Sequence, residues 1–420
     1  MRPKKRRAMR CEYCGSLETV KNGSRVIGVM SFGLRTTRAV SRYRCQACGR
    51  YFSRRREKGK KYTVGMKLEL ARMHVEERMS YRVMAKRIRE RFGKRVSPRV
   101  LCEMVNEVAS HAKGSLAIRR EYQPRWSGYL LIDDKYVSVR GRKLLSLVAA
   151  DSSGDALHSE VLEETDQGQV TDFLRFIVER LGYPLKAVTT DFDGRFGKAL
   201  EALDLGHILH QRCIWHGMQV VRRMLNHPVL RQKYWQLKAR LERAQREEGT
   251  GRDESSSLED LLAQFTALER EYQRQRALLG SLKEILYGLN PTVSHERFRA
   301  FCRTYRRLYP HVTAWLEDHL ELMLVHQQDR KIPQTNNIAE NLNRQIQRRF
   351  KTIEAFQSVE TAWNYQNLIR NYLRLKPYTD CRGSRRRCNG KSPWRSVGSF
   401  FRTMTGSNML PPGPELSAAK

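Results

Sequence analysis

The chain has 420 residues, of which 79 are Lys or Arg and 44 are Asp or Glu, so its formal net charge is +35. This length suits two or three domains with cores of their own, and the ordinary apolar content argues against a wholly disordered chain. No run of about 18 apolar residues occurs, so no membrane span is expected. The basic residues recur along the whole chain, which favours a polyanionic partner such as nucleic acid over a merely solvated basic face.

Residues 1–60 contain two cysteine pairs, each followed by a glycine. Each CxxC pair presents two thiolates from one tight turn, and two pairs can enclose a tetrahedral structural Zn²⁺. The predicted zinc ligands are Cys11, Cys14, Cys45 and Cys48. This spacing favours metal over disulfides and a reducing compartment. We therefore predict a zinc ribbon with a basic N-terminal arm, in which Thr37–Tyr43 is a strand and Arg54, Arg55 and Arg56 contact DNA.

Residues 61–115 have the pattern of a helix-turn-helix DNA-binding domain. Ser80 is predicted to cap a helix that Gly93 ends, and Ser97 with Pro98 is predicted to begin the next helix. The second helix has an apolar stripe of Val100, Leu101, Met104, Val105 and Val108. Arg99 and Asn106 are predicted on its outer side, where they would contact DNA in the major groove. The alternative is a helical hairpin without a DNA-binding role.

Residues 126–217 predict the first part of an α/β core. Strands are expected over 129–139, 143–150, 156–163, 185–190 and 207–213, with helices over 167–181 and 194–203. This order predicts a mixed sheet with helices on both faces, as in a ribonuclease H-like fold. An all-helical insertion is predicted over 218–332, the second part of the core over 333–400, and a tail over 401–420.

Acidic side chains occur at strand positions where burial would be costly without a metal or another partner. Asp133 lies within the first strand of the core, and Asp191 ends the fourth. Carboxylates of this kind suit Mg²⁺ or Mn²⁺. A third carboxylate is available from Glu340, which would share one helix face with Asn337 and Arg344.

These motifs resemble those of DDE transposases of the Mutator-like and bacterial insertion-sequence superfamily. The matching segments are Ile132–Val137, Thr190–Asp191, Gln211–His216, Thr335–Arg344 and Gly390–Pro393, within about residues 126–400. The resemblance implies a catalytic triad of Asp133, Asp191 and Glu340 that binds Mg²⁺ or Mn²⁺. It also implies nicking of transposon ends, joining of the 3′-OH to target double-stranded DNA, and assembly of a homo-oligomer. Such a protein would work in the cytoplasm or nucleoid of a prokaryote, or in a nucleus.

Further residues are assigned by the same resemblance. Cys213 and His216 form a CxxH element, interpreted as structural or as an aid to the active site, and Arg344 and Arg348 are expected to hold phosphates. The family carries a hydroxyl where this chain has Lys135, a departure that keeps Asp134 open as the ligand in place of Asp133. Two other functions remain open, a domesticated DNA-binding regulator and another nuclease of the ribonuclease H fold.

Overall fold

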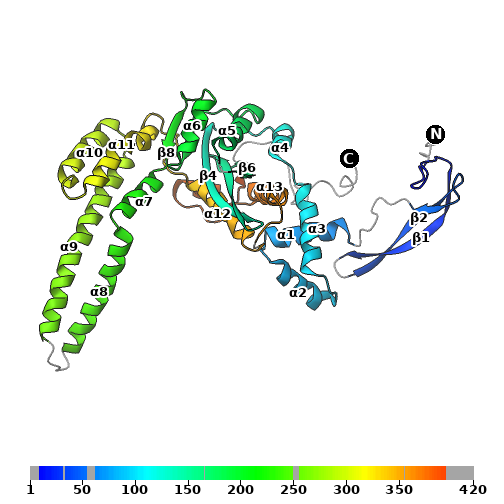
Figure 1. The fold of residues 1–420 in the computed structure, drawn as a ribbon, viewed down its shortest axis with the longest axis horizontal. Coiled ribbons are helices and arrows are strands. Elements are labelled where there is room, and N and C mark those ends of the chain that lie inside the picture. The colour runs from blue at the N-terminus through cyan, green and yellow to red at the C-terminus, as the bar shows by residue number, and fades with distance from the viewer. Residues whose placement is uncertain are drawn as a thin grey trace.

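The computed structural model describes residues 9–31, 34–53, 62–164, 166–248, 255–353 and 355–393. Figure 1 shows a small sheet near the N-terminus at one end, a central sheet with helices around it, and a long helical arm at the other end. In the part of the chain just given, no helix is both long and apolar enough to cross a membrane.

The N-terminal sheet has three antiparallel strands in the order β1-β2-β3. Its strands are β1 (Thr19–Ser31), β2 (Leu34–Cys45) and β3 (Tyr51–Ser53). The predicted strand Thr37–Tyr43 lies within β2, which confirms that element. Arg54, Arg55 and Arg56, predicted to contact DNA, lie outside the described residues.

Four helices follow this sheet: α1 (Val64–Val75), α2 (Tyr81–Phe92), α3 (Pro98–Ser110) and α4 (Ser115–Tyr122). The side chains of Ser80 and Ser97 accept hydrogen bonds from the first turns of α2 and α3, as predicted. Gly93 ends α2 with a left-handed backbone at φ 62°. The apolar stripe of α3 packs against α1, α2 and a later helix, so α3 contributes much of the core of this region.

The central sheet has five strands in the order β6-β5-β4-β7-β8. The strands are β4 (Tyr129–Val139), β5 (Arg142–Asp151), β6 (Ala156–Leu162), β7 (Ala187–Thr190) and β8 (Leu209–Arg212). The middle strand β4 is antiparallel to β5 and parallel to β7. The predicted mixed α/β arrangement is therefore confirmed.

Helices cover both faces of this sheet (Figure 1). On one face, α5 (Gln167–Arg175), a π-helical turn η1 (Phe176–Arg180) and α6 (Gly194–Ala202) pack against Leu130 and Ile132. On the other face lie α12 (Asn337–Phe350) and α13 (Val359–Leu375). Because successive side chains of a strand point to opposite faces, Asp133 points toward the α12 side.

The arm and the helices at its base occupy the sequence between β8 and α12. They are α7 (Ile214–Met224), α8 (His227–Glu248), α9 (Ser255–Leu286), α10 (Pro291–Tyr305), α11 (Pro310–Leu324) and a short 3₁₀ turn η2 (Val325–Gln327). The helices α8 and α9 pair along the arm, as the heptad-like spacing of Tyr234, Leu241 and Tyr272 predicts. The three side chains are buried.

The buried His74 of α1 makes stability depend on pH. Its Nδ1 lies 2.7 Å from the carbonyl oxygen of Met79, and desolvation lowers its pKa to about 4. A histidine in the unfolded chain takes up a proton near pH 6.5. Between pH 6.5 and about pH 4 the unfolded state therefore binds more protons than the folded state, and stability falls as the pH decreases. When the pH is lowered from 7 to 5, the free energy of unfolding of the wild type is expected to fall by roughly 2 kcal/mol more than that of His74→Gln.

Urea unfolding of both proteins at the two pH values measures this difference and cancels the other titrating groups. The exposed His207 is the control, because His207→Gln should show the same pH dependence as the wild type. Parallel pH profiles for wild type and His74→Gln would contradict the prediction.

Candidate active site and zinc cluster

The four predicted zinc ligands come together at the end of the N-terminal sheet. The sulfur atoms of Cys11 and Cys48 are 3.7 Å apart, those of Cys14 and Cys45 are 3.6 Å apart, and all four lie within 4.8 Å of one another. Four thiolates at such distances fit a tetrahedral Zn²⁺ and leave no open ligand position, which is typical of a structural site.

Two matching turns create this cluster. The amide of Gly15 donates to the carbonyl of Cys11, and the amide of Gly49 donates to the carbonyl of Cys45. Both glycines have positive φ, of 74° and 69°, which side chains rarely tolerate. Burial disfavours the Cys11 thiolate, but hydrogen bonds from the backbone of Tyr13 and Cys14 lower its pKa to about 7. The glycine after each CxxC pair therefore closes the turn that brings the two thiols of the pair together.

Zinc removal is expected to unfold this sheet, because Cys11, Cys45 and Phe52 are the only buried side chains among its residues whose burial is described. Atomic emission should detect about one zinc per wild-type chain, and Cys45→Ser should reduce this to a small fraction. Cys302→Ser, which removes a buried thiol of α10, is the control and should retain the metal. A full complement of zinc in Cys45→Ser would contradict the assignment.

Asp133 and Asp134 lie side by side on the middle strand but in different surroundings. Asp133 is 3% exposed, and Nδ2 of Asn343 donates to its Oδ2 at 2.9 Å. Desolvation raises its pKa to about 7, with further increases from Asp134 and Glu340. Asp134 is half-buried, and its pKa is raised to about 6 by desolvation and then by Asp191 and Asp193. The two neighbours therefore interact with different members of the predicted triad.

Asp191 follows β7, the parallel neighbour of β4. Arg212 holds the loop that contains Asp191, because its Nη1 donates to the carbonyls of Asp191 at 2.8 Å and Asp193 at 3.0 Å. An Asp191 carboxylate oxygen accepts a hydrogen bond from the amide of Asp193, whose own side chain caps α6. These contacts fix the loop that carries Asp191, whose charge raises the pKa of Asp134 on β4.

Glu340 belongs to the first turn of α12, a helix that packs on β4 and β5. Asn343, one turn further, provides the hydrogen bond to Asp133 and is fully buried. Asn336 precedes the helix, and its side-chain Nδ2 donates a hydrogen bond to the carbonyl oxygen of Ile132. Two asparagine side chains therefore fix the Glu340 helix against the strand that carries Asp133. Both residues lie in the Thr335–Arg344 segment that carries the family resemblance, but their contacts with β4 were not predicted, although the i+3 spacing of Asn343 from Glu340 was a usable signal.

Cys213 and His216 connect this region to α7. Cys213 is buried and accepts a hydrogen bond from the amide of Asn336 at 3.3 Å, which supports a structural role. Burial lowers the pKa of His216, against the opposing fields of Asp191 and Glu340. Its Nδ1 is buried without a hydrogen-bond partner. His216 therefore lies within the field of two predicted catalytic carboxylates.

The donor set of this site fits a hard divalent cation. In the described ranges, only the cysteines form a group of three or more potential ligands within 4.8 Å, so the three carboxylates are less closely gathered than that. Desolvation is the largest cause of the raised pKa of Asp133 and Asp134. Repulsion from neighbouring carboxylates also raises both values while Lys135 lowers them, and a bound cation would favour the charged forms. The side-chain oxygens of Asn336 and Asn343 are also buried without hydrogen-bond partners. Such oxygen-rich donors are typical of Mg²⁺ sites.

A basic groove of about 530 Å³ runs beside α12. Asn337, Arg344 and Arg348 line it, and all three are exposed. Four other cations line its walls, Arg78, Arg349, Lys376 and Arg382, and the sequence prediction missed the first three. Its acidic lining residues are Glu76 and Asp380. The positive residues outnumber them, so the groove suits an anionic polymer.

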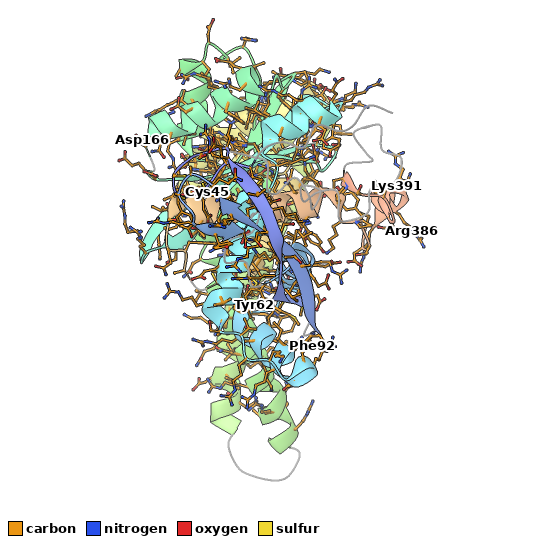
Figure 2. The ribbon with its side chains drawn as sticks, turned by 90° about the vertical axis from the view of Figure 1, so that its right-hand side faces the viewer. Cys45, Tyr62, Phe92, Asp166, Arg386 and Lys391 are labelled. Carbon is orange, nitrogen blue, oxygen red and sulfur yellow. The ribbon has the colours of Figure 1, made fainter. Side chains whose placement is uncertain are left out.

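The segment after α13 forms one wall of this groove. Asn389 joins two parts of this segment, because its side chain accepts a hydrogen bond from the backbone amide of Cys381 and donates one to the carbonyl of the same residue. Arg386 and Lys391 of this segment lie together at one edge of the molecule (Figure 2). The sequence did not predict that this segment and α12 line the same groove, because the two are far apart along the chain.

The two residues predicted to read DNA from α3 differ in exposure. Arg99 is exposed and pairs with Glu103 of the same helix at 3.1 Å. Asn106 is half-buried, and its Nδ2 donates to the sulfur of Cys102. The neighbouring α2 carries a broader exposed basic face, with Arg82, Lys86 and Arg89. Asp151, at the end of β5, is fully buried and accepts hydrogen bonds from the amides of Ser127 and Ser153, so it holds the turn after that strand.

Residues 261–372 match the family model described as Transposase, Mutator family. The match supports a Mutator-like transposase. It runs from α9 into α13 and therefore includes the helix of Glu340. The curated proteins include no match to the chain.

Proposed function

We propose that the chain is a metal-dependent DDE transposase that nicks transposon ends and joins the freed 3′-OH to target DNA. The observation that carries this proposal is the hydrogen bond between Asn343 and the buried Asp133, which holds the Glu340 helix against the middle strand. Asp191 follows the neighbouring parallel strand, and the charges of Asp191 and Glu340 raise the pKa values of Asp134 and Asp133, which supports a shared site for the three carboxylates. The strand order β6-β5-β4-β7-β8 supports a ribonuclease H-like core.

We assign Asp133, Asp191 and Glu340 as ligands of Mg²⁺ or Mn²⁺, with Asp134 as the alternative to Asp133. Divalent cations held there supply activation of a water nucleophile and stabilisation of the leaving 3′ oxygen. The chain's own contribution is to position the phosphodiester. Arg344 and Arg348, exposed on the α12 wall of the groove, hold phosphates, since guanidinium groups bind phosphate with two hydrogen bonds.

The other regions provide DNA contacts around this site. We assign the zinc ribbon to 1–60, the helix-turn-helix to 61–115, the core to 126–217 and 333–400, and the insertion to 218–332. Within the ribbon and the helix-turn-helix, the proposed contacts are Arg54, Arg55, Arg56, Arg99 and Asn106, together with the exposed face of α2. Pairing two transposon ends requires at least two active sites, so we propose that the working form is a homo-oligomer.

The test is a cleavage and strand-transfer assay with labelled DNA that carries the ends of the element. Incubation with Mg²⁺ or Mn²⁺ should produce nicks at the ends and joined products, and EDTA should abolish both. Tight binding to the ends without cleavage under any divalent metal would replace the proposal with a domesticated DNA-binding regulator. Cleavage of branched or RNA-containing substrates instead of these ends would indicate a different nuclease.

A further inference from the structure

The arm presents a basic surface with an exposed tryptophan at its centre. Two hollows lie along α8 and α9, and Trp235 lines both of them. The basic side chains of the first hollow are Arg222, Arg231, Arg276 and Lys283, and those of the second are Lys233, Arg240 and Arg243. Among the described residues, neither hollow is lined by an Asp or Glu side chain. We call these two hollows together the arm surface.

The cations of the arm surface have no acidic partner in the described part of the chain, and Arg276 contacts the neutral side chains of Gln273 and Tyr272. None of the seven has an ion pair with any residue in the described ranges of the chain. An uncompensated cluster of this kind is costly through self-repulsion unless an anionic partner neutralises it. The absence of carboxylates therefore distinguishes this surface from a solvated face with alternating charges.

Trp235 is 51% exposed on a rigid support. Behind it, Tyr234 stacks on Tyr272 at 4.3 Å and on Phe265 at 5.6 Å between ring centroids, and these contacts join α8 to α9. Tyr234 also contacts the Trp235 ring in a T-shaped arrangement at 5.3 Å. The packed ring stack limits the movement of the helix that carries Trp235, so the indole presents a face to solvent at a fixed place.

We propose that the arm surface binds DNA, with its cations on phosphates and Trp235 stacked on an unpaired base. An exposed aromatic ring among uncompensated Arg and Lys residues is the combination that single-stranded nucleic acid recognises. In an intact duplex the base faces are covered, so Trp235 contacts a base only at a gap, a nick or a single-stranded end. The proposal rests on the proposed function for the identity of the polymer as DNA.

The experiment measures binding of the full-length protein, in EDTA, to two DNAs of one sequence. One is an intact duplex of about thirty base pairs, and the other has a short central gap. Trp235→Ala should weaken binding to the gapped DNA about fivefold or more and change binding to the intact duplex less than about twofold. Trp235→Phe, which retains an aromatic face, should retain most of the affinity. Trp363→Ala, at a half-exposed tryptophan of α13 outside the arm surface, should bind as the wild type does.

The cations are tested through salt dependence. Replacing Arg231, Arg276 and Lys283 together by Ala should reduce the slope of log affinity against log salt by about 2–3, since each lost phosphate contact reduces it by about 0.9. The control replaces Arg299 and Arg303, which are exposed on α10, and should leave the slope unchanged.

Equal binding of gapped DNA by wild type and Trp235→Ala would overturn the proposal. A change in molar mass by light scattering in Trp235→Ala, with unchanged DNA affinity, would also overturn it and would make the arm surface a contact between copies of the chain. Because the assay contains no divalent metal, its outcome is independent of whether the protein cleaves DNA.

Discussion

Glu340→Gln is expected to reduce metal-dependent cleavage and strand transfer by about a thousandfold or more. The substitution keeps the size of the side chain and the first turn of α12 but removes one of three carboxylates around the proposed cation site. Loss of a cation that stabilises developing charge corresponds to several kcal/mol of activation free energy, and each 1.4 kcal/mol is a factor of ten. Affinity for transposon-end DNA in EDTA should remain within about twofold, because Glu340 contributes no positive charge to phosphate binding.

The rates are measured with labelled end DNA under single-turnover conditions. Glu360→Gln, at an exposed carboxylate on the neighbouring helix α13, is the control and should cleave at the wild-type rate. Asp191→Asn should behave as Glu340→Gln does. Comparison of Asp133→Asn with Asp134→Asn identifies the ligand on β4, since only the ligand variant should be inactive. Substantial cleavage by both Glu340→Gln and Asp191→Asn would refute the triad.

Asp155→Ala is expected to destabilise the protein by about 3–5 kcal/mol. Asp155 and Arg374 form a bidentate ion pair with distances of 2.6 and 2.7 Å, and both side chains are 1% exposed. Asp155 also accepts from the indole of Trp126 at 2.9 Å. Its loss would leave Arg374 buried beside Arg370, which is itself fully buried with no hydrogen-bond partner. Two guanidinium groups would then lack a counterion within the core.

Urea unfolding at neutral pH measures this loss. Glu317→Ala breaks an ion pair with Arg306 in which both side chains are exposed, and it should cost less than about 1 kcal/mol. The double variant Asp155→Leu, Arg374→Met should recover much of the stability, because it removes both charges from the core. A loss below about 1 kcal/mol in Asp155→Ala would show that Arg374 gains another partner when Asp155 is absent.

The sequence predicted the bounds of helices and strands closely where a pattern within a few residues marks them. The strand over 129–139 and the start of the helix at 98 coincide with β4 and α3, because alternation, capping and proline placement act within a few residues. The clustering of the four cysteines was also predicted, since a CxxC pair defines its own turn. The helix expected over 167–181 continues as the π-helical turn η1 after Arg175, which no short-range signal marks.

The sequence by itself determined which carboxylates and thiols the protein carries and how strongly positive its charge is. Only the tertiary structure decided which of them share surroundings. Asp133 and Asp134 are adjacent in sequence, yet the pleat of β4 directs one toward Asn343 and Glu340 and the other toward Asp191. The groove beside α12 likewise combines Arg78, Arg344 and Lys376 from three distant segments. Burial and electrostatic coupling depend on distances through space, and the packing of the whole chain sets those distances.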